Sequence, residues 1–236
     1  MRSARVLAHR GACRVARENT VEAFAAARAL GADGVELDVH RTADGVLVVH
    51  HDADAAGFGV LAHHAEAEIR RALPFVPTLV EALDACAGLL VNVEVKNLPG
   101  DADFDPDDRA ASAVVELLHA RDGRDDVLVS SFNLKSIDRV RSLDPRVATG
   151  FLTLLGFDPL EGAAVAHARG HQAVHPDVRS LRGPAAAAVV ARAHDLGLDV
   201  NAWTVDEPSE IRRLADAGVD GIVTNVPDVA RSALSE

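Results

Sequence analysis

The sequence predicts a closed (β/α)8 barrel, an α/β fold in which parallel strands alternate with helices. Apolar, β-branched runs alternate along the chain with Ala/Leu-rich stretches that have helical spacing. The length of 236 residues is near that of such barrels. The alternative is an open doubly wound sheet, but no Gly-rich dinucleotide loop follows the first apolar run.

Nine segments have the pattern of strands, and the helical stretches lie between them. The expected strands span residues 5–9, 34–40, 46–51, 89–96, 127–132, 147–153, 173–175, 200–205 and 221–225. The expected helices span residues 20–30, 78–87, 106–120, 134–143, 159–168, 184–196, 208–217 and 227–234. We interpret residues 46–51 as the second arm of a hairpin after 34–40, which leaves eight strand–helix units. Several helices begin with proline, whose missing N–H does no harm in the first turn.

The same pattern indicates a single domain over residues 1–236, without an interdomain linker. Residues 99–108, acidic and containing Pro and Gly, are expected to form a long mobile loop. With 48% hydrophobic residues the chain can bury a sizeable core. The net charge of −12 argues against a broad basic face for nucleic acid or anionic membranes. An anionic substrate would therefore be held by local positive charge.

The remaining composition favours a cytoplasmic protein. Cys13 and Cys86, the two cysteines, are widely separated and are expected to be reduced thiols. The first residues run directly into the first strand without the pattern of a signal peptide. No apolar run is long enough for a transmembrane segment. The oligomeric state is not indicated.

Three carboxylates in two of the expected strands are candidate metal ligands. Alternate residues of a strand face the same side, so Glu36 and Asp38 share one face, and Glu94 and Lys96 share another. If both faces point into the barrel, the carboxylates need a cation or hydrogen-bond donors. Three such groups suit Mg2+ or Ca2+. The alternative is that these acids are solvated surface charges or pair with arginines.

Two histidine motifs lie at strand ends, where catalytic residues of such barrels collect. His9 closes an apolar run and is followed by Arg10 and by Gly11, which allows a tight exit from the strand. His50 and His51 precede Asp52 and face opposite sides, so alternation does not select between them. These groups could supply acid–base catalysis and a phosphate clamp. Alternatively, the pair is an ordinary loop feature.

In their order, these motifs resemble the glycerophosphodiester phosphodiesterase family, over nearly the whole chain. The matching pieces are His9-Arg10-Gly11, Glu18-Asn19-Thr20, residues 31–39, Asp44-Gly45, residues 48–52, Glu94-Val95-Lys96, His175-Pro176, residues 201–205 and residues 218–228. The resemblance implies a barrel hydrolase that converts glycerophosphodiesters, small-molecule substrates, to glycerol 3-phosphate and an alcohol. Such an enzyme would serve lipid and glycerol metabolism.

The resemblance also assigns roles to individual residues. It implies that His9 and His51 are the acid–base pair and that Glu36, Asp38 and Glu94 bind a divalent metal ion. Arg10 and Lys96 would bind the phosphate. Trp203 would contact the glycerol part of the substrate, although a lone tryptophan can equally be a core residue. Asn19 would support the site.

Two departures from the family pattern and two alternative functions complete the expectations. The insertion that usually follows His51-Asp52 is reduced here, and Asn225 stands where the family often has Asp, a difference expected to be minor. A related barrel phospholipase acting on lysophospholipids would use the same groups but needs an apolar rim near the pocket. A catalytically silent barrel that binds a phosphorylated ligand would not need the intact set of histidines and acids.

Overall fold

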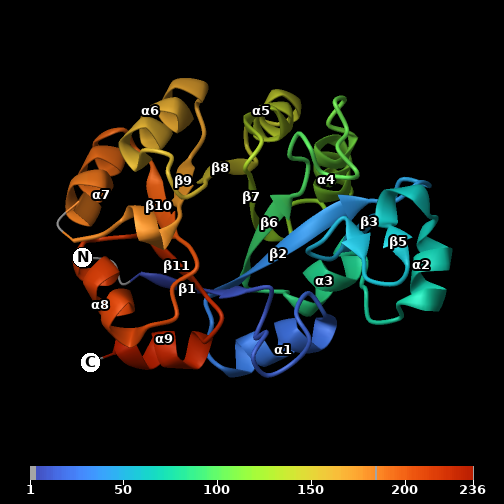
Figure 1. The fold of residues 1–236 in the computed structure, drawn as a ribbon, viewed down its shortest axis with the longest axis horizontal. Helices are drawn as coiled ribbons and strands as arrows, with labels where there is room; N and C mark the ends of the chain where they lie inside the picture. The colour runs from blue at the N-terminus through green and yellow to red at the C-terminus, as the bar shows by residue number, and fades with distance from the viewer. Residues whose placement is uncertain (1–3, 184, 236) are drawn as a thin grey trace.

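The computed structural model describes residues 4–183 and 185–235, and its centre is a closed barrel of eight parallel strands (Figure 1). These strands are β1 (Arg5–His9), β2 (Gly34–Arg41), β6 (Leu90–Val95), β7 (Asp126–Ser131), β8 (Ala148–Thr153), β9 (Ala173–Pro176), β10 (Asp199–Ala202) and β11 (Gly221–Thr224). Because β1 pairs with both β2 and β11, the first and last strands close the ring. The (β/α)8 prediction is confirmed, and the open sheet is wrong.

Helices surround the barrel, as Figure 1 shows. They are α1 (Val21–Ala29), α3 (Leu79–Ala85), α4 (Arg109–Ala120), α5 (Leu134–Leu143), α6 (Pro159–Arg169), α7 (Ala185–Asp195), α8 (Pro208–Asp216) and α9 (Pro227–Ala233). The Thr20 and Thr78 side chains cap α1 and α3 by accepting backbone N–H groups of their first turns. Proline occupies the first turn of α6, α8 and α9. The expected start of α7 at Pro184 lies outside the described residues.

The apolar core lies between the strands and the helices, and this decides where the polar strand residues point. Val35, Leu37 and Val39 of β2 are buried in one cluster with Val91, Val93 and Val95 of β6 and with helix residues such as Phe24 and Leu79. The alternate residues of β2 and β6 therefore face the barrel interior. These are Glu36, Asp38, Asn92 and Glu94, all buried.

A small insertion follows β2 on one side of the barrel (Figure 1). Strand β3 (Leu47–Val49) pairs antiparallel with the end of β2, which confirms the predicted hairpin. Next come β4 (Asp54–Ala55), β5 (Gly59–Val60), the 3-10 turn η1 (Leu61–His63) and α2 (Glu66–Ala72). We expected no elements here. They bury a small cluster of their own, formed by Val48, Ala55, Leu61, Ile69 and Val76.

The segment between β6 and α4 has neither helix nor strand, as expected, but it is anchored rather than free. Asn97 is buried and donates to the Asp105 carbonyl at 2.9 Å and to the Asp108 carboxylate at 2.7 Å. The Asp105 N–H donates back to the Asn97 side chain at 2.7 Å. Asp103 inserts a buried carboxylate toward β2. The expectation of a mobile loop missed these contacts, most of which lie within the segment itself.

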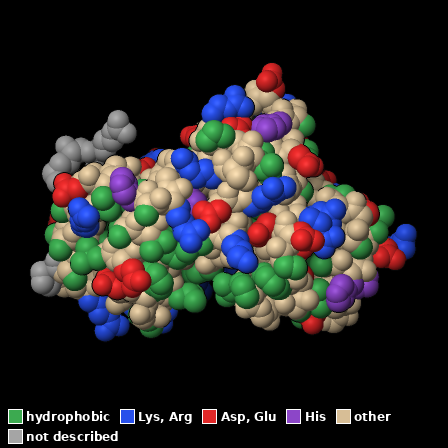
Figure 2. Space-filling model, turned by 90° about the horizontal axis from the view of Figure 1, so that it is seen from above, with side chains coloured by type: hydrophobic (Ala, Val, Ile, Leu, Met, Phe, Trp, Pro, Cys, Tyr) green, Lys and Arg blue, Asp and Glu red, His purple; other side chains and the backbone are tan. Residues whose placement is uncertain are grey.

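The outer surface has no large region of one charge in the view of Figure 2, where acidic and basic side chains are interspersed. None of the described helices has the length and apolarity needed to cross a membrane. Cys13 and Cys86 are free thiols, as predicted.

Candidate active site

Three buried carboxylates meet near the C-terminal ends of β2 and β6. Glu36 and Asp38 come from β2, and Glu94 of β6 is the register partner of Asp38. One oxygen atom from each residue lies within 4.8 Å of the others. The sequence predicted this convergence correctly. An all-oxygen set of this kind fits a hard divalent cation.

The two nearest cations compensate only part of this negative charge. Lys96 Nζ lies 2.8 Å from Glu94 Oε1 and 3.2 Å from Asp38 Oδ1, and Arg10 Nε lies 3.5 Å from Asp38 Oδ2. Burial raises the pKa of Asp38, but Lys96 and Arg10 outweigh it and lower this pKa to about 2. Burial raises the pKa of Glu94 to about 6. Burial and the neighbouring carboxylates raise the pKa of Glu36 well above its usual value. Glu36 and Glu94 are thus the groups that a bound cation would stabilise in their ionised form.

Arg10 and Asn19 link the loop after β1 to these carboxylates. The Arg10 N–H donates to Glu36 Oε2 at 3.0 Å, and its guanidinium donates to Glu18 at 3.0 Å. Asn19 donates to Asp38 Oδ2 at 2.8 Å. The tight turn requires glycine at position 11, where φ is +79° and a Cβ would lie 2.7 Å from the Ala23 carbonyl carbon. The expected supporting role of Asn19 therefore has a structural basis.

His9 lies at the end of β1 with its ring held by a residue from the other end of the chain. Its Nδ1 lies 2.7 Å from Asn225 Oδ1, and its Nε2 lies 3.9 Å from Glu36 Oε2. The Asn225 amide nitrogen donates to Asp206 at 2.7 Å, so the amide oxygen faces His9 and Nδ1 carries the hydrogen. Burial, together with Arg10, lowers the pKa of His9. The lowered pKa favours the neutral ring, and Nε2 is directed toward Glu36.

His51 lies in the loop after β3. Its Nδ1 lies 2.7 Å from Asp52 Oδ1, which leaves Nε2 for a ligand. Burial lowers the pKa of His51. The negative charge of Asp38 raises this pKa, whereas the positive charges of Lys96 and Arg10 lower it further. His51 lines a cavity of about 270 Å3 together with Glu94 and Lys96. His50 instead bonds to the Asp52 carbonyl at 2.8 Å and does not line this cavity.

Trp203 lies just past the end of β10 rather than inside the strand. Its indole N–H donates to the His175 carbonyl at 2.8 Å. Its ring packs edge-on against Phe132, with 5.4 Å between centroids, and Phe132 lines the cavity that contains His51. Trp203 is half-buried, so it is not a fully enclosed core residue. It lies one aromatic ring away from that cavity.

Comparison with known proteins decides the family. A sequence model described as the glycerophosphoryl diester phosphodiesterase family matches residues 9–229. The chain belongs to this family. As a member of this family, the chain hydrolyses glycerophosphodiesters.

Relatives of this family member cover almost its entire length. A glycerophosphodiester phosphodiesterase from Caldanaerobacter subterraneus subsp. tengcongensis is 31% identical, with 94% of each chain covered. The crystal structure of a glycerophosphodiester phosphodiesterase from Parabacteroides distasonis has a TM-score of 0.85 at 26% identity, covering 99% of this chain and 97% of that chain. An Oleispira antarctica phosphodiesterase, solved with the product sn-glycerol-3-phosphate, has the same fold, with a TM-score of 0.85 at 23% identity and coverage of 99% and 98%.

Within this phosphodiesterase site, the contact of Asn225 with His9 was missed by sequence reasoning. The replacement of Asp by Asn was noted, but its place opposite a catalytic candidate was not. The two residues are 216 positions apart, and only the pairing of β1 with β11 brings them together. Asp206, which accepts hydrogen bonds from both the main chain and the side chain of Asn225, was also missed. Their position at strand ends was the only available signal.

Proposed function

We propose that the chain converts glycerophosphodiesters to glycerol 3-phosphate and an alcohol, with one divalent cation, Mg2+ or Ca2+, held by Glu36, Asp38 and Glu94. The observation that carries this proposal is the partly compensated carboxylate triad between two histidines. The product bound by the Oleispira relative supports the choice of product. The donor set supports a hard cation.

In this mechanism the phosphodiester binds against Arg10 and Lys96. When bound, the cation would supply positive charge to the phosphoryl oxygens. Arg10 and Lys96 stabilise the charge that develops in the transition state. In both histidines Nδ1 has a hydrogen-bond partner, which leaves Nε2 for proton transfer. One takes a proton from the attacking oxygen and the other protonates the leaving alkoxide. Attack by water gives glycerol 3-phosphate directly, whereas attack by the glycerol 2-hydroxyl gives a cyclic phosphate that water then hydrolyses to the same product. Trp203 and Phe132 offer an apolar surface for the glycerol carbons.

The test of the metal assignment uses Glu36→Gln and an enzyme-coupled assay for glycerol 3-phosphate, with and without EDTA. We expect EDTA to abolish turnover, and Glu36→Gln to weaken Mg2+ or Ca2+ binding in titration calorimetry and remove most activity. Glu161→Gln, on the exposed first turn of α6, is the matched control and should behave as wild type. Wild-type turnover of Glu36→Gln in metal-depleted buffer would refute the site.

The proposal also includes the domain organisation, the cellular location and the binding partners of the enzyme. Residues 1–236 act as one domain, since β1 and β11 close a single barrel. Free thiols fit the cytoplasm, and the acidic net charge fits a protein that does not bind nucleic acid. The products would enter lipid and glycerol metabolism.

One observation favours lysophospholipids as a second substrate class. Leu98 and Leu154 line the cavity beside His51, and Leu155 and Phe157 are exposed in the following loop. This apolar rim comes from the loops after β6 and β8 and not from the short segment after His51. Release of the headgroup alcohol from micellar lysophosphatidylcholine, at rates comparable to those on glycerophosphocholine, would support this second function. Absence of turnover would exclude it.

A further inference from the structure

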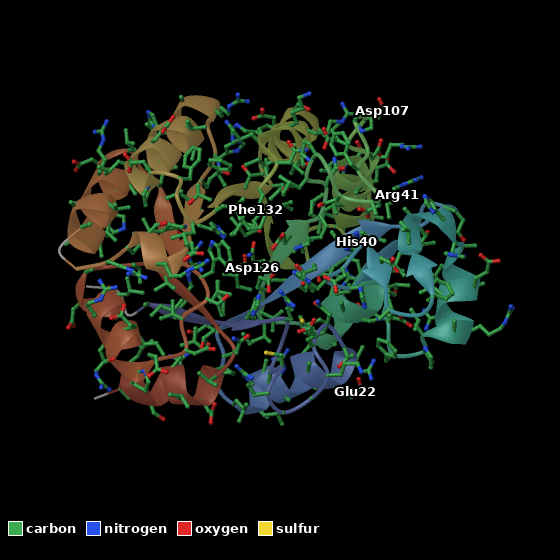
Figure 3. The ribbon with its side chains drawn as sticks, in the orientation of Figure 1. Glu22, His40, Arg41, Asp107, Asp126 and Phe132 are labelled. Carbon is green, nitrogen blue, oxygen red and sulfur yellow. The ribbon has the colours of Figure 1, made fainter. Side chains whose placement is uncertain are left out.

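His40 is a buried histidine beside the site that the mechanism above does not use. It lies on β2, two residues after Asp38, and its side chain is 2% exposed. In Figure 3 it is labelled near the C-terminal end of β2, beside the insertion. Its ring contacts two loops that flank the cavity of His51. Nδ1 lies 2.6 Å from Asp103 Oδ2, and Nε2 lies 3.2 Å from the main-chain carbonyl oxygen of His51.

The partners of His40 fix the hydrogen on Nε2. A carbonyl oxygen can only accept, so the hydrogen bond to His51 requires an N–H at Nε2 of His40. On the other side, one proton lies between Nδ1 and the Asp103 carboxylate, whichever of the two atoms holds it. Among the described residues, Asp103 Oδ1 is buried without a hydrogen-bond partner. The hydrogen bond of the Asp103 carboxylate is therefore the one to His40.

This arrangement holds the main chain at His51 from both sides. Strand β3 ends at Val49, so regular pairing does not fix the following residues. The His50 N–H donates to the Asp38 carbonyl at 3.0 Å, which anchors the chain before His51. The bond from His40 anchors it at the His51 carbonyl. Both anchors belong to β2, the strand that carries Glu36 and Asp38.

We propose that His40, held by Asp103, is a positioning residue that fixes the main chain at His51 and thereby the place of the His51 ring relative to the phosphate. This inference rests on the proposed catalytic role of His51. It links the loop between β6 and α4 to catalysis through Asp103. A misplaced proton-transfer group slows the chemical step more than it weakens substrate binding.

The test compares two amides that each retain one of the two contacts of His40. Glutamine places its amide nitrogen near the position of Nε2, and asparagine places its amide nitrogen near that of Nδ1. His40→Gln therefore keeps a donor for the His51 carbonyl, while His40→Asn keeps one for Asp103. We expect kcat of His40→Gln within about threefold of wild type and that of His40→Asn lowered about tenfold, the range of one hydrogen bond. KM and the affinity for Mg2+ should stay unchanged in both.

A purely structural role in anchoring the loop predicts the opposite order, with His40→Asn the more active. That order, or an equal loss in kcat with changed KM and metal affinity, would overturn the proposal. If the His40 variants do not fold by circular dichroism, Asp103→Ala takes their place. It should lower kcat without changing KM, and wild-type kcat would overturn the inference. Asp107→Ala, at an exposed residue of the same loop, is the control and should be neutral.

His51→Ala separates a failure of this inference from a failure of the proposed function. Loss of activity in His51→Ala together with the reversed order of the amides would refute only the role of His40. Full activity of His51→Ala would refute the assignment of His51, and the role of His40 with it.

Discussion

The two histidines of the site are held in different ways. His9 belongs to the barrel: its ring bonds to Asn225, which Asp206 holds, and its side chain is 19% exposed. His51 belongs to a loop: its ring bonds to Asp52, whose side chain is 70% exposed, and its own side chain is 34% exposed. The barrel thus fixes one ring through its side-chain partner. The other is fixed mainly through the main chain, by contacts to β2.

This difference concerns energetics as well as geometry. A hydrogen bond between buried groups is costly to break, because the groups left behind lose their partners away from water. An exposed hydrogen bond such as His51–Asp52 contributes little, because water replaces it. We infer that the His9 side is preorganised by the fold, and that the His51 side depends on its loop.

The largest expected effect is the loss of either ring. His9→Ala and His51→Ala should each lower kcat by roughly 10²–10⁴-fold, the usual contribution of a general acid or base. His50→Ala, which removes a ring directed to the Asp52 carbonyl, should cost far less. Steady-state kinetics with a glycerophosphodiester check this, with folding verified by circular dichroism. Equal losses for His50→Ala and His51→Ala would contradict the assignment of the loop histidine.

A smaller effect is expected at Trp203, which directly follows the barrel strand β10. Trp203→Ala removes a ring that packs against Phe132, so we expect KM for glycerol-containing diesters to rise about 2- to 10-fold, the range of one aromatic contact. A synthetic diester without glycerol should be much less affected, and the melting temperature should change by only a few degrees.

The intrinsic fluorescence of Trp203 gives an independent readout, since it is the sole tryptophan. Glycerol 3-phosphate added with metal should perturb its emission. A silent emission spectrum together with a severely destabilised Ala variant would mean that Trp203 serves the core.

The smallest effect should come from Asn225→Asp, which gives His9 a charged partner. Burial and Arg10 hold the pKa of His9 below its usual value, and a carboxylate favours the protonated ring. The pKa of His9 should therefore rise, and the limb of the kcat/KM profile that reports His9 should move to higher pH. Asp52→Asn changes the partner of His51 in the opposite sense and should move its limb to lower pH. An unmoved profile for Asn225→Asp would show that the Asn225 contact does not control His9.

The sequence was most informative where strands alternate, and least where distant side chains meet. Glu36, Asp38 and Glu94 could be placed together because alternation on β2 and β6 fixes which face each residue takes. Helix α2 was missed because it has seven residues, of which only Ile69 is buried, so its apolar period is too short to detect. The contacts of His40 with Asp103 and of His9 with Asn225 depend on loop packing and barrel closure, which no local pattern encodes.

The pairing of β1 with β11 also sets an order of events during synthesis. His9 is made before its hydrogen-bond partner, which follows 216 residues later. At about 5–20 residues per second, roughly 10–40 s separate the two on the ribosome. During this interval β1 has neither its neighbour β11 nor the residue that orients its histidine. The chain should therefore gain phosphodiesterase activity in one late step, when β11 pairs with β1 and closes the barrel.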